Sequence, residues 1–334
     1  MLAIRICCHR GYGQRMYSDR SKRREFITLL GCATEWPLPA RAQQSIPLVR
    51  LLTSPFGGRS IKGGMDVTIS AIGPLLPERR TELVRYDDVQ IEVVLEGNGS
   101  AVVLLPSLAR DSDDYDEVAE GLAAGGFRVL RPKPRGIGRS IGPMTKITLH
   151  DFARDIAEVV KAHGGGKAVV VGHAYGNWVA RMTATDYPAL VRGVVIAAAP
   201  AKQYPPELAA TVPKAGNLSL SDEERLAALR FAFFAPGNDP TVWLKGWHLE
   251  IRDSQRAAVA AVKQDEWWSG GTAPLLELQA ANDPFKPESK RNEMKDEFGS
   301  RVTVTVIPNA SHALIPEQPK AVVEALVQWI KSLP

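Results

Sequence analysis

The chain contains few cysteines, and their positions exclude several kinds of chemistry from most of it. Its 334 residues include three cysteines, all within the first 32 positions, at Cys7, Cys8 and Cys32. Residues 43–334 therefore hold no disulfide, no thiol nucleophile and no cysteine-based metal site. They also lack a cluster of histidines and carboxylates with the spacing of metal ligands, and they lack a glycine-rich loop of the kind that binds phosphate. We therefore expect no metal and no organic cofactor.

After residue 42 the chain also lacks long apolar runs and an excess of positive charge. The formal net charge of +4 arises in residues 1–42, which hold eight Lys and Arg and three Asp and Glu. The rest of the chain holds 33 Lys and Arg and 34 Asp and Glu, and is therefore nearly neutral. A membrane span needs about 20 apolar residues, and a nucleic-acid-binding surface needs a basic excess. We expect neither, and instead a small-molecule substrate. The chain is 45% hydrophobic and long enough for one large domain.

Residues 1–42 have the features of an export leader. Arg23 and Arg24 precede a short apolar stretch at residues 28–33, and Ala40-Arg41-Ala42 has the small-residue pattern of a cleavage site. The segment resembles bacterial twin-arginine leaders, which are addresses read by the export machinery and not membrane anchors. The resemblance implies a periplasmic or secreted protein.

Other interpretations of this segment stay open. Cys32, after Leu29-Leu30-Gly31, approximates a lipoprotein signal, and a basic N-terminus without any targeting role is a second alternative. A leader that does not function would leave the protein in the cytoplasm. Met16 would give a more ordinary leader length than Met1, so a start at Met16 is a further alternative.

Regular secondary structure is expected to begin at Thr81, after a linker or extended arm at residues 43–80 that is rich in glycine, proline and serine. From there β-forming and amphipathic segments alternate. The predicted strands cover residues 81–86, 89–96, 101–105, 127–130, 168–171, 191–199, 275–280 and 302–307. The predicted helices cover residues 115–124, 149–163, 178–187, 286–298 and 320–330. This order predicts an α/β fold with a mostly parallel, doubly wound sheet and an antiparallel hairpin at its start.

The alternation is interrupted at about residues 200–272. A helix is predicted over residues 221–234, with Ser221 as N-cap and Glu224 in a capping box. Four tryptophans follow it, at Trp243, Trp247, Trp267 and Trp268. A helical insertion over the carboxyl edge of the sheet would place Trp243 and Trp247 where they contact a substrate. The alternative is that these aromatics only pack the insertion against the sheet.

The most informative segment, Gly172-His173-Ala174-Tyr175-Gly176, has the form of a nucleophile elbow without a nucleophile. It follows an apolar run that ends at Val171 and precedes the start of a helix. Small residues at the first and last positions of such a motif permit the sharp strand-to-helix turn. The central residue is normally the attacking Ser, Cys or Asp of hydrolytic chemistry. Here it is Ala174, whose methyl group cannot attack.

Residues 81–334 resemble the α/β-hydrolase fold, with a helical cap inserted after the sixth strand. The resemblance rests on the elbow, on Arg135-Gly136-Ile137-Gly138-Arg139-Ser140, on Asp283 and on Asn309-Ala310-Ser311-His312, in family order. It implies that Asp283 orients the base His312 and stabilises its cation. The alternatives are a helix-capping role for Asp283 and an ordinary surface-loop position for His312.

The resemblance also implies where a developing oxyanion is stabilised. Tyr175, which follows the apex of the elbow, would donate one backbone amide. Leu108, in the loop after the third strand, would donate the other.

Three further residues near the elbow are candidates for substrate contact. Ser107 and Arg110 depart from the His-Gly start that is usual in their loop, and either could touch a ligand. The alternatives are a turn at Ser107 and an ion pair of Arg110 with Asp111 or Asp113. In the family the position of His173 often packs beneath the elbow, so a structural role for His173 is favoured over contact with the ligand.

Together these residues predict an enzyme with a non-standard mechanism. His312, held by Asp283, would deprotonate a water molecule or a substrate proton in an apolar, capped pocket, without a seryl intermediate. The substrate would be a small ester, lactone, amide or related carbonyl compound, and proton abstraction from carbon, as in lyase-like or cofactor-free oxygenase members, is a variant. Covalent catalysis by Ser107 or Tyr175 is disfavoured. The alternatives are a catalytically inactive pseudohydrolase that binds a ligand or a partner, and an engineered replacement at Ala174.

Overall fold

The computed structural model describes residues 79–334. The predicted leader at residues 1–42 and all but the last two residues of the predicted arm at 43–80 lie outside the described residues. Within the described part of the chain, no helix is both long enough and apolar enough to cross a membrane.

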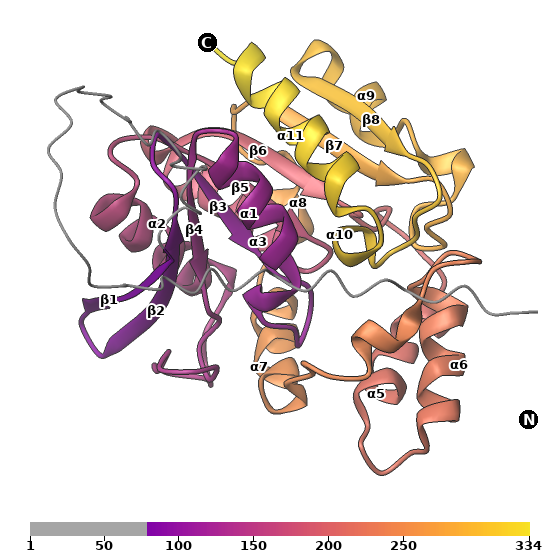
Figure 1. The fold of residues 1–334 in the computed structure, drawn as a ribbon. Helices are drawn as coiled ribbons and strands as arrows, with labels where there is room; N and C mark the ends of the chain where they lie inside the picture. The colour runs from indigo at the N-terminus through magenta and orange to yellow at the C-terminus, as the bar shows by residue number, and fades with distance from the viewer. Residues whose placement is uncertain (1–78) are drawn as a thin grey trace, which may run out of the picture. The chain divides into compact units, whose positions relative to one another are not determined.

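Within residues 79–334, eight strands form one sheet in the order β1-β2-β4-β3-β5-β6-β7-β8 (Figure 1). Their bounds are β1 (Arg80–Tyr86), β2 (Val89–Glu96), β3 (Ser100–Leu105), β4 (Phe127–Pro132), β5 (Ala168–His173), β6 (Val191–Ala197), β7 (Leu275–Ala280) and β8 (Val302–Ile307). The pairs β1–β2 and β2–β4 are antiparallel, and all later pairs are parallel. The predicted α/β-hydrolase fold, with an antiparallel hairpin opening a mostly parallel sheet, is confirmed.

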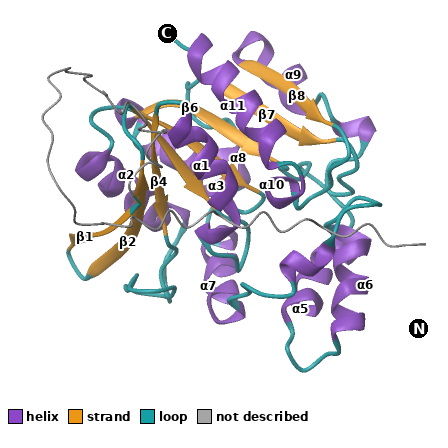
Figure 2. Cartoon of the chain, viewed as in Figure 1, coloured by secondary structure: helices purple, strands orange, loops and turns teal. Residues whose placement is uncertain are grey.

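Helices cover both faces of this sheet (Figure 2). The helices outside the β6–β7 interval are α1 (Asp116–Ala124), α2 (Leu149–His163), α3 (Gly176–Asp186), α9 (Glu293–Phe298), α10 (Leu314–Glu317) and α11 (Pro319–Ser332). One apolar cluster joins α2, α3 and α9 to the side chains of Val103 and Leu105, and another joins α1, α10 and α11 to Val102 and Leu104. Since successive side chains of a strand point to opposite faces, β3 supplies both cores and is buried along residues 101–105.

The interval between β6 and β7 forms the cap. Its helices are α4 (Pro206–Ala209), α5 (Thr211–Gly216), α6 (Asp222–Ala232), α7 (Leu249–Ala260) and α8 (Gln264–Trp268). Figure 1 shows α5, α6 and α7 gathered below the sheet in that view. The predicted capping box begins α6, because the Ser221 hydroxyl accepts a hydrogen bond from the Glu224 amide at 3.3 Å and the Glu224 carboxylate accepts one from the Ser221 amide at 2.9 Å.

Two predicted elements are longer than the observed ones. The predicted helix over residues 286–298 contains only α9, preceded by a short 3₁₀ turn. Pro287 disfavours a helical conformation at Lys286, and the Lys286 Nζ atom lies 2.8 Å from the buried Glu277 carboxylate. The strand predicted over residues 191–199 ends at Ala197, because Ala198 adopts a φ of 43° and turns the chain out of the sheet.

Candidate active site

The elbow between β5 and α3 has the geometry that its sequence predicts. Ala174 adopts a φ of 47°, a left-handed conformation that is strained for a residue with a side chain. A Cβ atom on Gly172 would lie 2.2 Å from the Gly176 carbonyl oxygen, and one on Gly176 would lie 2.5 Å from the Leu105 carbonyl oxygen. Glycine is therefore required at both positions. The chain keeps the strained turn of a nucleophile elbow although the residue at its apex carries no nucleophile.

Asp283 and His312 lie together at the carboxyl edge of the sheet. Asp283 follows β7, His312 follows β8, and the His312 Nδ1 atom lies 2.9 Å from the Asp283 Oδ2 atom. Both side chains are buried. The second oxygen of Asp283 accepts a hydrogen bond of 2.8 Å from the Phe285 amide. A carboxylate on Nδ1 fixes the tautomer that leaves Nε2 unprotonated and able to accept a proton.

Two neighbours fix the position of His312. The Phe285 ring stacks on its imidazole, with ring centroids 4.0 Å apart. The His173 Nε2 atom lies 2.6 Å from the His312 carbonyl oxygen. Complete burial, with a smaller effect of the His312 charge, lowers the pKa of His173 to about 3. His173 is therefore neutral, its Nε2–H donates to that carbonyl, and it holds the backbone of His312.

Leu108 and Tyr175, the two predicted oxyanion donors, both line the elbow cavity. Neither the Leu108 amide nor the Tyr175 amide donates a hydrogen bond to another described residue. The loop that holds Leu108 is fixed by the cap, because the Ala109 amide donates to the Gln255 side chain at 2.9 Å and the Ala109 carbonyl accepts from the His248 amide at 2.9 Å. Two amides without a partner beside a vacant apex can stabilise a negative oxygen.

A cavity of about 490 Å³, the elbow cavity, opens above these groups. On the sheet side it is lined by Ser107, Leu108, Ala174, Tyr175 and His312. The other lining residues are mostly apolar: Trp178, Pro200, Tyr204, Ala209, Val212, Phe233, Arg256, Ala257, Val259, Ala260 and Phe285. The volume and the mostly apolar lining suit a small organic molecule.

The structure thus brings together most of the residues expected at the site. Ser107, Leu108, Ala174, Tyr175 and His312 line the elbow cavity, and Asp283 contacts His312 from behind. The lining aromatics Trp178, Tyr204, Phe233 and Phe285 were not predicted from the sequence, although two of them lie in the predicted cap.

Arg110, Trp243 and Trp247 do not line the elbow cavity, so their expected contact with substrate needs correction. The Arg110 guanidinium forms a bidentate pair with Asp114, not with Asp111 or Asp113. Its carbon lies 4.6 Å from the Trp243 ring centroid and 4.9 Å from that of Trp247. Arg110, Trp243 and Trp247 thus pack the cap against the loop after β3. This agrees with the alternative expectation that the tryptophans pack the insertion and do not contact substrate. His173 likewise lies beneath the elbow and outside the lining.

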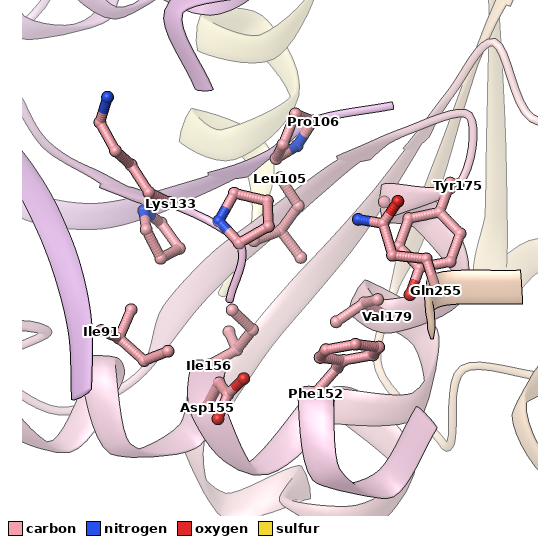
Figure 3. A pocket seen from close by; sticks show the side chains of 13 residues that line it. Ile91, Leu105, Pro106, Lys133, Phe152, Asp155, Ile156, Tyr175, Val179 and Gln255 are labelled. Carbon is pink, nitrogen blue, oxygen red and sulfur yellow. The ribbon is translucent and has the colours of Figure 1, made fainter. Parts of the chain in front are cut away.

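A second, much smaller cavity of about 50 Å³ lies on the other side of Tyr175. Figure 3 shows the Tyr175 ring beside Gln255, Val179 and Phe152 at one end of this apolar space, with Ile91 at the other. The Tyr175 hydroxyl is buried and has no hydrogen-bond partner among the described residues. Burial raises the pKa of this hydroxyl well above its usual value, so it stays protonated and unsuited to nucleophilic attack.

The glycine-containing segment at residues 135–140, which contributed to the resemblance, has a structural role. Arg135 is buried, and its Nε and Nη2 atoms lie 2.9 and 2.8 Å from the two oxygens of Asp155 on α2. The same segment does not line the elbow cavity. Within residues 79–334 no group of three or more His, Cys, Asp or Glu side chains is arranged to hold a metal ion.

Comparison with known proteins agrees with this architecture. The chain is 28% identical over 131 residues to the 2-(acetamidomethylene)succinate hydrolase of Mesorhizobium japonicum, a match that spans 39% of this chain and less than half, 46%, of that protein. It is 24% identical over 266 residues to the non-heme chloroperoxidase of Streptomyces lividans, covering 70% of this chain and 93% of that one. Among solved structures, an esterase from Exiguobacterium antarcticum superposes with a TM-score of 0.62 at 18% identity, over 75% of this chain and 99% of its own.

These relatives carry different activities on one fold, so the fold alone does not identify the reaction. The model of one family, described as the alpha/beta hydrolase family, matches residues 102–325. That range contains the elbow, Asp283 and His312, and it accounts for most of the chain. The chain therefore belongs to the alpha/beta hydrolase family.

Proposed function

We propose that this protein is a hydrolase of small, largely apolar esters, lactones or related carbonyl compounds that works without a covalent intermediate. One observation carries the proposal: the His312–Asp283 pair, 2.9 Å apart, borders an apolar cavity in which Ala174 occupies the nucleophile position. A base and its orienting acid have no role in a purely structural cavity. A methyl group at the apex leaves room for the water molecule that replaces a serine.

In the proposed reaction His312 Nε2 takes a proton from a water molecule above Ala174, and the water oxygen attacks the substrate carbonyl carbon. The carbonyl oxygen becomes an oxyanion that accepts hydrogen bonds from the Leu108 and Tyr175 amides. The His312 imidazolium, stabilised by Asp283, then donates its proton to the leaving oxygen as the carbon–oxygen bond breaks. The products of an ester are a carboxylic acid and an alcohol.

A pseudohydrolase that only binds a ligand is the second candidate. The observation in its favour is the same vacancy at Ala174, because the strained elbow and the 490 Å³ cavity persist without a nucleophile. A binding protein would use the cavity but would not depend on His312 for any turnover.

Hydrolysis of a short-chain 4-nitrophenyl ester by the full chain and its variants separates these candidates. We expect His312→Ala and Asp283→Asn each to lower kcat/KM by about 100-fold or more, since both remove general-base catalysis. His150→Ala is the matched control, because His150 is a histidine on the surface and its ring pairs with Asp186 far from the cavity lining. Turnover that is equal in wild type and His312→Ala would contradict the proposal, and no turnover in any variant would favour the binding protein.

We also propose that residues 1–42 direct the protein to the periplasm or out of the cell. The support is the paired Arg23 and Arg24 ahead of a short apolar stretch and the Ala40-Arg41-Ala42 pattern. This segment carries the entire basic excess of the chain, with eight Lys and Arg against three acids.

A further inference from the structure

The lining of the elbow cavity includes one side chain with a permanent charge. Among the described residues that line it, Arg256 on α7 is the single Lys, Arg, Asp or Glu, while His312 is the only other ionisable group besides tyrosines. Arg256 is exposed and lies on the cap, whereas His312 lies on the opposite, sheet side of the cavity. Arg256 therefore contributes a cation to the lining from a different element than the one that holds His312.

Arg256 has no acidic partner among the described residues. The acid that precedes it by three positions on α7, Asp253, is held by Arg252 at 2.7 Å. Arg225 of the cap is likewise engaged, since it pairs with Asp222 at 3.1 Å. A cation without a counter-ion at the rim of an apolar cavity attracts anions more strongly than one in open water, because the low-dielectric wall focuses its field.

Tyr204 supplies a hydrogen-bond donor beside this cation. Its ring packs on Phe285 with centroids 5.2 Å apart, and the residue lines the elbow cavity. Burial raises the pKa of the Tyr204 hydroxyl while the nearby Arg256 charge opposes that rise. The hydroxyl is therefore protonated, and Tyr204 and Arg256 both line the elbow cavity, where one ligand can reach both side chains.

A second cation near the cavity is already neutralised. A cleft of about 230 Å³ adjoins the elbow cavity and shares Trp178, Pro200, Tyr204 and Val259 with it. Lys202 lines this cleft, but its Nζ atom lies 2.9 Å from a carboxylate oxygen of Glu297. Among the described residues that line the elbow cavity and this cleft, Arg256 is thus the cation without an acidic partner.

We infer that Arg256, with the Tyr204 hydroxyl, binds a carboxylate on the substrate, so that the preferred substrates are esters or related compounds with an apolar body and an anionic group remote from the reacting carbonyl. This inference rests on the proposed function and names its substrate class. Arginine suits the role because its planar guanidinium binds a carboxylate through two parallel hydrogen bonds.

The test compares two esters with the same six-carbon acyl chain, mono-4-nitrophenyl adipate and 4-nitrophenyl hexanoate. We expect Arg256→Gln to lower the adipate-to-hexanoate ratio of kcat/KM by about tenfold, the size of one charge-assisted contact. We expect the change in KM for the adipate ester and not in kcat, and a KM that rises with added salt in wild type. The control is Arg230→Gln, which removes an exposed cation of α6 in the same cap that does not line the cavity.

The outcomes separate the inference from the proposed function. If wild type hydrolyses both esters, and Arg256→Gln changes the adipate-to-hexanoate ratio no more than Arg230→Gln does, the inference is overturned and the proposed function stands. If wild type hydrolyses neither ester, the proposed function fails, and calorimetry with monomethyl adipate then tests the site by itself. Binding that weakens in Arg256→Gln supports the carboxylate site in a non-catalytic protein, whereas binding that is absent or unaffected by the substitution overturns it.

Discussion

At the scale of single residues, the proposed mechanism gives the attacking role to water, because Ala174 occupies the position of the nucleophile. Such a site loses the rate advantage of a covalent intermediate but keeps a base, two amide donors and a confined substrate. Each of these contributes independently of the nucleophile, as residual catalysis in enzymes without their nucleophile indicates. The protein hydroxyls near the apex belong to Ser107 and Tyr175, and both line the elbow cavity.

We predict that neither hydroxyl attacks the substrate. Tyr175→Phe keeps the backbone amide and removes a buried hydroxyl without a partner, so kcat/KM should fall by less than about tenfold, and the free energy of unfolding should stay constant or rise by up to about 1 kcal/mol. Ser107→Ala should likewise lower kcat/KM by less than about tenfold. Steady-state kinetics and urea unfolding measure both effects. A loss of several hundredfold in either variant would identify that hydroxyl as the nucleophile.

His173 gives the folded protein a specific dependence on pH. Its pKa is about 3 in the folded protein and 6.5 in an ordinary setting, so the unfolded chain takes up a proton that the folded chain excludes. Neutral His173 therefore contributes fully to the free energy of unfolding above about pH 6.5, and this contribution is lost as the pH falls below that value. Between about pH 7.5 and pH 5.5 this single group should lower the free energy of unfolding by about 1.4 kcal/mol.

The variant His173→Gln isolates this effect, because it keeps a donor toward the His312 carbonyl and removes the titration. Urea unfolding of wild type and His173→Gln at the two pH values should show a smaller decrease in the variant, by about 1.4 kcal/mol. Equal decreases in both proteins would show that His173 does not carry the dependence.

At the scale of elements, the elbow is a strand, a turn and a helix packed so closely that two glycines are obligatory. We predict that Gly172→Ala lowers the free energy of unfolding by at least about 3 kcal/mol or prevents folding, because its Cβ would meet the Gly176 backbone at 2.2 Å. Gly237→Ala is the control: its φ is 92°, but no atom lies within 4 Å of its Cβ, so only the backbone strain of about 1–2 kcal/mol applies. Urea unfolding and the yield of folded protein compare them. Equal stabilities would contradict the close-packed elbow.

Elements with strong periodicity were predicted well from the sequence, and those shaped by tertiary contacts were not. The helix at Leu149–His163 and the strand at Leu275–Ala280 match the prediction at both ends. The sequence predicts a helix that begins at Lys286, because no residue near it in the sequence indicates its buried ion pair with Glu277.

The same distinction holds for the site. The elbow, Asp283 and His312 follow from local motifs and their order along the chain. Arg256 looks like any exposed helix arginine in the sequence, and Phe233 and Phe285 look like ordinary core residues. Their place in the cavity depends on how the cap folds over the sheet, which no short pattern encodes. The side chains that form the cavity wall opposite the elbow were therefore not identified beforehand.

At the scale of the whole molecule, basic charge and the enzyme domain occupy different parts of the chain. Residues 1–42 hold the basic excess, and the rest is nearly neutral. We predict that a twin-arginine-competent bacterium exports and cleaves the protein after Ala42, and that replacing both Arg23 and Arg24 by lysine blocks this step. Cell fractionation with mass determination of the N-terminus measures it. An uncleaved chain confined to the cytoplasm would contradict the leader.

The central claim is that water, activated by His312, attacks the substrate without an acyl-enzyme. Its most direct test is rapid quenching during turnover of a 4-nitrophenyl ester, followed by intact-protein mass measurement, with Ala174→Ser as a positive control. We expect Ala174→Ser to accumulate the mass of one acyl group, whereas wild type should turn over with an unchanged mass and without a burst of nitrophenolate. A burst equal to the enzyme concentration together with an acylated wild-type chain would contradict it.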